Sequence, residues 1–225
     1  LIAGFRGEVR LGTPVARIER KAGQVTIVDG AGHSDRFDEV IIASHADQAL
    51  AMLADPSSQE QELLGAFRYS RNLTVLHQDA TLLPKRKMLW GAWNYFGRRY
   101  ANDATGDLCV SYWMNRLQGY HTRDPLVVTL NPHRPIDPKL EISRTSFDHP
   151  IFDHAALDAQ RRIWAIQGQR NTFFCGAHLG AGFHEDGLQA GLAVAEMLGA
   201  RRPWTVEDQN GRLSLDLAPV REAAE

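Results

Sequence analysis

The residues with the clearest chemical potential lie in one glycine-rich stretch, 176–191, near the C-terminal end of the sequence. It follows the short apolar run 171–175 and precedes a segment with helical periodicity, 185–198. A strand, a glycine turn and the start of a helix direct backbone N–H groups and the positive end of the helix dipole toward an anion or an electron-rich ring. Glycines allow the main chain to approach such a ligand closely.

The spacing of these glycines leaves two interpretations open. The dinucleotide fingerprint G-x-G-x-x-G is not met, because the segment from Gly180 to Glu185 ends in glutamate. We find no other candidate for this fingerprint after a predicted strand, and no phosphate-loop motif. A tight strand–helix connection with glycines for packing therefore explains the spacing as well as a ligand site does.

Hydrophobic patterning predicts the elements that position this stretch. In the N-terminal part we expect strands at 14–20, 24–29 and 37–44, and helices at 46–54 and 57–67. The run Val40–Ala43 is continuously apolar, which is typical of a strand in a parallel sheet that is covered on both faces. In the C-terminal part we expect a helix at 155–167, a strand at 171–175 and a helix at 185–198 that Gly199 ends.

The middle of the chain is richer in aromatic residues and strands. We expect strands at 72–78, 88–95, 108–117, 126–130 and 140–147, with a polar loop at 97–107. In the first of these, the face that carries Leu73 and Val75 continues with His77 and Asp79. Both polar residues are candidates for proton handling or substrate orientation. The alternative is a surface histidine and an aspartate that caps the strand end.

Composition narrows the partner classes. The chain has 225 residues, 25 basic and 27 acidic, with a net charge of −2 and no long run of one sign, so a nucleic-acid partner is not expected. No apolar window is long enough for a transmembrane helix. Cys109 and Cys175 match no metal or redox spacing, and no histidine pair has metal-ligand spacing. We therefore expect no metal site and a cytoplasmic protein. The sequence has no signal peptide and no initiator Met, and from the missing Met we expect a fragment.

Several separated motifs together resemble a known family. Residues 182–191, Gly-Phe-His-Glu-Asp-Gly-Leu-Gln-Ala-Gly, are similar to the C-terminal flavin-contacting motif of the flavin-dependent amine oxidase superfamily. Further agreement lies in the segments 41–50, 76–84, 90–95 and 110–117. The resemblance is to the bacterial branch of predicted NAD/FAD-binding proteins that is associated with cyclopropane-fatty-acid synthases, and it extends over residues 9–199.

The resemblance implies an α/β fold with a discontinuous, partial Rossmann-like FAD-binding domain. Residues 1–54 would form its adenine-side hairpin and strand, and residues 168–200 its flavin-contacting strand–turn–helix. Residues 55–167 would form an inserted, mixed-sheet substrate domain, and 201–225 a tail. The N-terminal βαβ unit that holds the pyrophosphate in this family is not part of the sequence.

The resemblance also assigns site residues. The expected FAD-binding residues are Val15, Ala43, Ser44, Gly176, Gly180, Gly182, Phe183, His184, Glu185, Asp186, Gly187 and Leu188. Ala177 stands where the family commonly has an acidic residue, so that polar contact is either absent or supplied by Glu185 or Asp186. In the substrate domain, the residues that would line a pocket are Trp90, Trp93, Asn94 and Tyr112, although aromatic residues at strand spacing also serve as core.

The implied function is that of an FAD-dependent oxidoreductase that removes a hydride from a C–H or C–N bond of a small amine or a lipid. Two alternatives stay open. The chain is a catalytically idle flavin-binding module that supports a lipid-modifying partner, or it is too short to hold FAD. The sequence does not indicate an oligomeric state.

Overall fold

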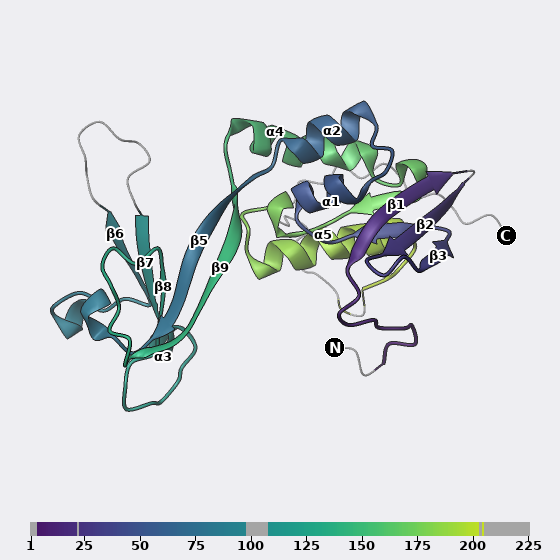
Figure 1. Cartoon of the computed structure of the whole chain (residues 1–225). Helices are drawn as coiled ribbons and strands as arrows, with labels where there is room; N and C mark the ends of the chain where they lie inside the picture. Colours follow the sequence, from purple (N-terminus) through teal and green to yellow (C-terminus); the bar gives the residue numbers. More distant parts are fainter. Residues whose placement is uncertain (1–3, 22, 98–107, 203, 205–225) are drawn as a thin grey trace. The chain divides into compact units, whose positions relative to one another are not determined.

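The computed structural model describes residues 4–21, 23–97, 108–202 and 204. The predicted 97–107 loop and 201–225 tail lie almost entirely outside these residues. The chain divides into two compact units, which are described separately (Figure 1). Unit 1 comprises residues 1–68 and 150–225, and unit 2 comprises Tyr69–His149.

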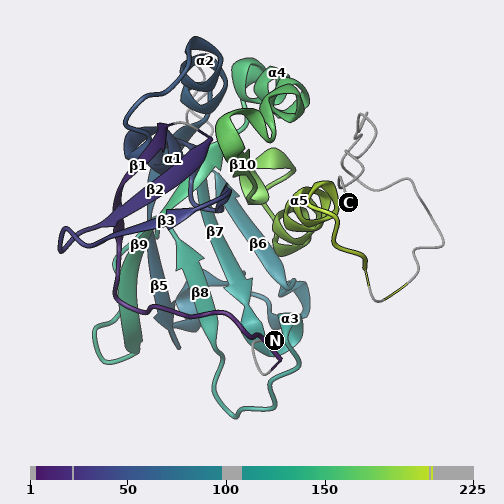
Figure 2. The ribbon, with the colours of Figure 1, turned by 90° about the vertical axis from the view of Figure 1, so that its right-hand side faces the viewer.

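Unit 1 contains an antiparallel three-stranded sheet of β1 (Val15–Lys21), β2 (Gln24–Asp29) and β3 (Ser34–Phe37), which is seen in Figure 2. The Asp29 carboxylate accepts the backbone N–H of Ala31 and of His33 and so fixes the turn before β3. The sequence pattern predicts β1 and β2 correctly but not β3. The exposed, polar residues of β3 lack the apolar alternation by which a strand is recognised.

A second sheet in unit 1 pairs β4 (Val40–Ile42) with β10 (Thr172–Phe174) in parallel, as the apolar run predicted. The outer edge of β10 is covered by Gln167, whose side chain donates to the Phe174 carbonyl at 2.7 Å and accepts the Phe174 N–H at 2.8 Å. The prediction that β4 is covered on both faces is wrong for the described residues. Ile41 is 46% exposed, because only the face that carries Val40 and Ile42 is packed.

The helices of unit 1 follow the sequence prediction. They are α1 (Ala46–Met52), α2 (Ser58–Gly65), α4 (His154–Arg162) and α5 (His184–Met197), with 3₁₀ turns η3 (Ile163–Ile166), η4 (Gln169–Asn171) and η5 (Ala177–Leu179). Ser57 and Glu60 form a capping box at the start of α2, and Asp153 caps α4. Gly199, with φ 88°, follows the end of α5 as expected.

A buried ion pair fixes α2 to the first sheet. Arg20 of β1 makes two hydrogen bonds to Glu60 of α2, and its Nε donates to Asp55 at 3.1 Å. The Arg20 and Glu60 side chains are 1% and 4% exposed. Burial acts to raise the pKa of Glu60, but hydrogen bonds from Arg20 and Ser57 outweigh it and lower the pKa below its ordinary value. Both groups are therefore charged in the folded protein.

Unit 2 is built on a five-stranded sheet in the order β6-β7-β8-β5-β9 (Figure 2). The strands are β5 (Arg68–His77), β6 (Trp93–Gly97), β7 (Leu108–Trp113), β8 (Val127–Leu130) and β9 (Glu141–Ile151). Two predicted strands, 88–95 and 108–117, are too long. Lys87–Leu89 instead forms the 3₁₀ turn η2, and Met114–Leu117 forms the short helix α3.

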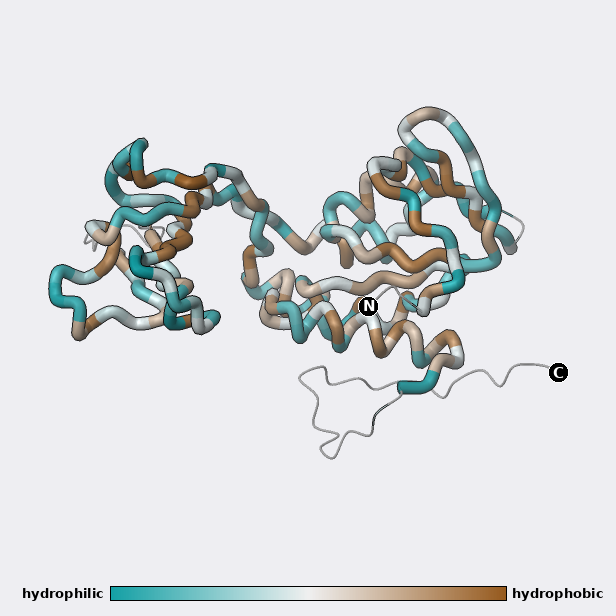
Figure 3. Tube along the Cα trace, turned by 90° about the horizontal axis from the view of Figure 1, so that it is seen from below, coloured by the Kyte–Doolittle hydropathy of each residue, from teal (hydrophilic) through white to brown (hydrophobic). Residues whose placement is uncertain are grey.

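The two faces of the unit 2 sheet differ. On one face Val75 packs with Leu82 of η1 (Ala80–Leu82) and with Ile136 in a buried cluster. On the other face Trp93 and Tyr95 are 42% and 57% exposed. Apolar residues recur along the strands and helices of both units (Figure 3). One face of the unit 2 sheet is thus a core and the other is an open aromatic surface.

The predicted substrate domain, 55–167, contains all of unit 2 and also α2 and α4, which belong to unit 1. Helix α2 packs against α1 and α4 within unit 1. This packing joins segments far apart in the sequence, so composition does not reveal it.

Candidate functional site

The ends of the two parallel strands of unit 1 meet beside the start of α5. The N–H of Cys175, after β10, donates to the carbonyl of Ile42 in β4 at 3.1 Å. The Ser44 carbonyl oxygen lies 3.7 Å from the position of a Cβ added to Gly176. A Cβ added to Gly187, in the first turns of α5, would lie 3.6 Å from the Ala177 nitrogen. The carboxyl ends of parallel strands are the usual place for ligands in α/β folds.

The first turn of α5 has backbone donors without acceptors. The Asp186 carboxylate accepts the Phe183 N–H at 2.8 Å and so caps the helix. No acceptor for the N–H of His184 or of Glu185 is found in the described part of the chain, and both residues are exposed. These two N–H groups and the positive end of the helix dipole favour a negative or electron-rich group at this position.

The glycines of the turn serve two different purposes. A Cβ on Gly176 would lie 2.8 Å from the His178 ring, and one on Gly180 would lie 2.6 Å from the Asp186 side chain. Gly182 has φ 89° and a Cβ there would lie 3.3 Å from Phe152. Packing or backbone conformation within the protein therefore accounts for these three glycines. Gly187 is different, because an added Cβ would make only ordinary contacts with Ala177.

The two carboxylates of the turn point in different directions. Glu185 accepts a hydrogen bond from Gln189 on the next turn at 2.6 Å. Asp186 is 1% exposed, and its Oδ1 has no hydrogen-bond partner among the described residues. An unpartnered buried acceptor is costly and uncommon in folded proteins. Asp186 Oδ1 is therefore a buried acceptor next to Gly180, and Ala177 has no polar side chain.

The sequence analysis missed His178, which lies in the same turn. It is 5% exposed, packs edge-on against Phe67 at 4.9 Å between ring centroids, and has no partner for Nε2 among the described residues. Burial and the nearby His45 lower the pKa of His178 to about 4, against the opposing effect of Asp47. The imidazole is therefore neutral at physiological pH. In the sequence, the position of His178 inside the glycine-rich stretch 176–191 is its one distinguishing feature, because it has no partner at metal-ligand spacing.

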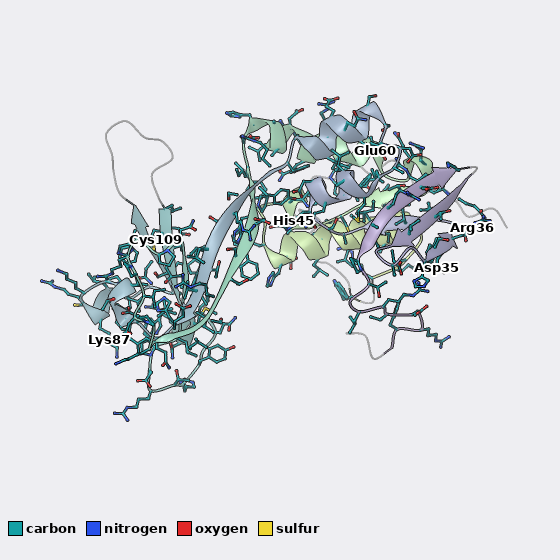
Figure 4. The ribbon with its side chains drawn as sticks, in the orientation of Figure 1. Asp35, Arg36, His45, Glu60, Lys87 and Cys109 are labelled. Atoms are coloured by element: carbon teal, nitrogen blue, oxygen red, sulfur yellow. The ribbon has the colours of Figure 1, made fainter. Side chains whose placement is uncertain are left out.

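The structure brings together most of the predicted cofactor residues, but Val15 is placed apart from them. Ala43 and Ser44 follow β4, and the residues from Gly176 to Leu188 surround the start of α5. Figure 4 labels His45, the residue after Ser44, at the N-terminus of α1. Val15 begins β1 at an irregularity in the pairing with β2 and lines a hollow of about 380 Å³ with Ile27 and Phe37.

His77 and Asp79 lie inside unit 2 and use their polar atoms within the protein. His77 is fully buried, with Nε2 2.7 Å from the Thr129 hydroxyl and Nδ1 accepting the Asp79 N–H at 3.1 Å. Burial lowers the pKa of His77 below its ordinary value, against the opposing charges of Asp79 and Glu141. The Asp79 carboxylate accepts from Thr81 and from the Asp137 N–H. This arrangement is structural, and it gives no support to the prediction of proton handling.

The four predicted pocket residues do not line one cavity. Trp93 and Tyr112 are cross-strand partners with ring centroids 5.2 Å apart, on the open face of the sheet. Trp90 instead contacts Trp113, which follows Tyr112 in β7 and so points to the opposite face. Asn94 is buried and its amide bonds to the backbone of Gly91 and Ser111. Of the four, Trp93 and Tyr112 lie together on the open face of the sheet, and Trp90 lines a hollow with Trp113.

No group of three or more His, Cys, Asp or Glu side chains among the described residues is arranged to hold a metal ion. None of the helices within the same ranges has the length and apolar character needed to cross a membrane.

Comparisons with solved structures show a shared fold. The chain is similar to a CLA-producing fatty acid isomerase from P. acnes, with 14% identity and a TM-score of 0.50, over 83% of this chain and 47% of that one. It is also similar to reduced UDP-galactopyranose mutase, with 13% identity, a TM-score of 0.55 and coverage of 85% and 48%. A third similar structure is wild-type putrescine oxidase bound to putrescine, with 12% identity and a TM-score of 0.52, over 84% of this chain and 49% of that one. The chain thus spans about half the length of these proteins.

A comparison with curated proteins gives no significant match. The sequence profile of the flavin containing amine oxidoreductases matches residues 5–140, which is more than half of the 225-residue chain. The match includes β4 and most of the unit 2 sheet, and the structural similarity extends beyond it. The chain belongs to the flavin containing amine oxidoreductase family.

Proposed function

We propose that this chain is the flavin-side part of an FAD-dependent oxidoreductase that removes a hydride from an amine or a lipid-type substrate. The family supports the cofactor class and the reaction class. By their names, two proteins of similar fold act on putrescine and on a fatty acid, which supports the two substrate classes. We also propose a cytoplasmic location, because Cys109 and Cys175 are buried free thiols.

One observation carries the proposal. The ends of β4 and β10 and the start of α5 converge, and there the N–H groups of His184 and Glu185 lack acceptors within the described residues. These features fit a flavin, which has carbonyl and ring nitrogen acceptors on a flat surface. Gly187 has room for a Cβ beside Ala177, and Leu188, 49% exposed, adds an apolar contact.

The residues of the turn would hold and orient the cofactor, which when bound supplies the two-electron acceptor. The N–H groups of His184 and Glu185 would donate to an acceptor atom of the ring. The dipole of α5 favours negative charge on a group held against its N-terminus. The hydrogen bond between Glu185 and Gln189 helps to keep that carboxylate in place along the helix. Asp186 fixes the helix start by capping Phe183.

We propose that the open face of the unit 2 sheet contacts the substrate. Trp93 and Tyr112 present an apolar, aromatic surface, which suits an alkyl chain or an alkylamine. Burial, and to a lesser extent the neighbouring Tyr95, raises the pKa of Tyr112, so its hydroxyl stays protonated and can donate a hydrogen bond.

Reduction of bound FAD by a panel of amines and unsaturated fatty acids, followed anaerobically by loss of flavin colour, tests the proposal. We expect one class to bleach the flavin. We expect Trp93→Ala to lower kcat/KM at least about tenfold, since the loss of a contact worth about 1.4 kcal/mol has that effect. The matched control is Phe96→Leu on the other face of β6, which should leave kcat/KM unchanged.

A different result would favour the second candidate function. FAD that is reduced by dithionite but by no substrate would indicate an idle flavin-binding module. Equal kcat/KM for the Trp93→Ala and Phe96→Leu variants would contradict the assignment of the substrate face.

A further inference from the structure

A basic and apolar patch lies on two loops of unit 2. Its first part is the exposed run Lys85–Leu89, which reads Lys-Arg-Lys-Met-Leu. Its second part consists of four exposed residues that follow β7, namely Arg116, Leu117, Tyr120 and Arg123. We call these nine residues the loop patch.

The sheet topology brings the two loops to one end of unit 2. The first loop runs from the end of β5 to the start of β6, and the second from the end of β7 to the start of β8. The pairing of Trp93 with Tyr112 and of His77 with Val127 places all four strand ends together. Figure 4 shows Lys87 at this end of the sheet and Cys109, the second residue of β7, at the opposite end. The loop patch is therefore one surface, although its two parts are about 30 residues apart in the sequence.

The cations of the loop patch have no acidic partners. Most other arginines of the described chain form ion pairs, including Arg20, Arg68 and Arg162. Among the described residues, no ion pair involves any of the five basic side chains of the loop patch, which are Lys85, Arg86, Lys87, Arg116 and Arg123. Their positive charge is thus directed to the solvent.

Exposed apolar side chains lie among these charges. Met88 is 85% exposed and Leu89 is 62% exposed, and they directly follow the basic run. Leu117 and Tyr120, on the second loop, are 42% and 49% exposed. Large apolar side chains next to clustered cations are the pattern of surfaces that enter the headgroup region of a membrane.

A hollow of about 560 Å³, large enough for a phosphate headgroup, borders the loop patch, and four residues of the patch line it: Lys87, Arg116, Tyr120 and Arg123. Trp90 and Trp113 form part of its wall, with ring centroids 5.2 Å apart, and Lys87 Nζ lies 5.6 Å from the Trp90 ring. Arg116 donates to the Trp90 carbonyl at 3.0 Å and is thereby held at the rim. The Trp113 Nε1 is buried without an acceptor in the described part of unit 2. Three cations and one acid, Asp124, line the hollow, so it favours an anion.

We propose that the loop patch binds the surface of an anionic phospholipid bilayer. A phosphate headgroup would occupy the hollow between Lys87 and Arg116, and Met88 and Leu89 would enter the boundary of the acyl chains. A nucleic acid would also attract the cations, but it offers no apolar layer to Met88 and Leu89. The proposal uses unit 2 alone and does not depend on the bound flavin or on the reaction.

Vesicle cosedimentation of the full chain tests this proposal. Vesicles that contain phosphatidylglycerol and phosphatidylcholine should bind the protein, and vesicles of phosphatidylcholine alone should bind it much less. We expect the triple variant K85S/R86S/K87S to weaken binding at least about tenfold, because each basic residue near an anionic surface contributes about fivefold. We expect Met88→Ser with Leu89→Ser to weaken binding also at high salt, where the electrostatic contribution is screened.

Two matched variants control for charge and for hydrophobicity. The triple variant R6S/R36S/R71S removes the same charge at exposed positions outside the loop patch and should bind like the wild type. The double variant Val9→Ser with Leu11→Ser removes two apolar side chains that are 54% and 88% exposed, and it should also bind like the wild type. Equal weakening by patch and control variants would overturn the proposal, as would equal binding to both vesicle types. Binding to soluble RNA that competes fully with vesicles and is insensitive to the Met88 and Leu89 substitutions would also overturn it.

Discussion

Two buried side chains, Asp186 in the first turn of α5 and His178 in the preceding turn η5, carry polar atoms that have no partner among the described residues. Both lie within four positions of Gly182 and on the side of unit 1 where β4 and β10 end. Buried polar atoms usually acquire a partner from protein, water or ligand. At the scale of single residues, the exposed N–H groups of His184 and Glu185 differ from these buried atoms, because only the N–H groups face solvent.

His178 makes stability depend on pH. Its pKa of about 4 in the folded protein lies below the ordinary value of 6.5, so the unfolded chain binds the proton more tightly. The free energy of unfolding should therefore fall as the pH drops from about 6.5 to about 4, with a contribution from His178 of about 3 kcal/mol. Above pH 6.5 this contribution to stability is fully present.

Urea unfolding at a series of pH values measures this effect. The His178→Gln variant should lose about 3 kcal/mol less over that interval than the wild type does, whereas the exposed His121→Gln should behave like the wild type. The buried His77 acts in the same direction, so some dependence on pH will persist. Identical slopes for His178→Gln and the wild type would contradict a lowered pKa of His178 in the folded protein.

The sequence predicted the location of the turn but not the use of its residues. Glycine spacing could not separate packing from ligand binding, because Gly176, Gly180 and Gly182 are required by neighbouring side chains or by their φ angles. That distinction depends on three-dimensional contacts. The sequence likewise left His77 open between proton handling and a surface position, because Thr129, whose hydroxyl lies against its Nε2, is 52 positions away in the sequence.

At the scale of elements, the buried pair of Arg20 and Glu60 connects the first sheet of unit 1 to α2. Replacement of Glu60 by Ala would leave the buried guanidinium with only Asp55 as an acidic partner. We expect the free energy of unfolding to fall by about 3–5 kcal/mol, because an uncompensated buried charge has a cost of that size.

Chemical denaturation of Glu60→Ala beside Glu62→Ala provides the comparison. Glu62 lies on α2 like Glu60 and pairs with Arg162 of α4. Because both side chains of this pair are about half exposed, the loss of the Glu62 carboxylate should cost at most about 1 kcal/mol. A Glu60→Ala variant as stable as Glu62→Ala would mean that Arg20 finds another acceptor or water.

Element types were largely predictable, and their limits and pairings were less so. The apolar run of β4 and the helical periodicity of α5 are local signals, and both elements occur where expected. Segments 87–89 and 114–117 adjoin the apolar residues of β6 and β7 in the sequence. At the end of the sheet, however, they form a 3₁₀ turn and a short α-helix. Strand β3 was missed because it has almost no buried residues. Pairing of β4 with β10 joins residues more than 100 positions apart, which no local pattern encodes.

At the scale of the whole molecule, the chain has one unit with a glycine-rich turn before α5 and one with an open aromatic sheet face. It spans about half the length of the solved structures that share its fold. Ile41 of β4 lies on a face of its two-stranded sheet that the described residues leave uncovered.

The most direct test of the proposal that the turn before α5 holds flavin is a titration of FAD with the folded chain, followed by flavin fluorescence. The wild type is compared with the Gly187→Ala and Gly191→Ala variants. An added Cβ meets only ordinary contacts at Gly187 and nothing within 4 Å at Gly191, so both variants should fold at least as stably as the wild type. If the turn holds flavin, the wild type should bind saturably. Gly187→Ala should then bind about tenfold more weakly, because a methyl group in the space beside Ala177 would push the ring away from the start of α5, and Gly191→Ala should bind like the wild type. No saturable binding by the folded chain, or equal affinity of all three proteins, would contradict it.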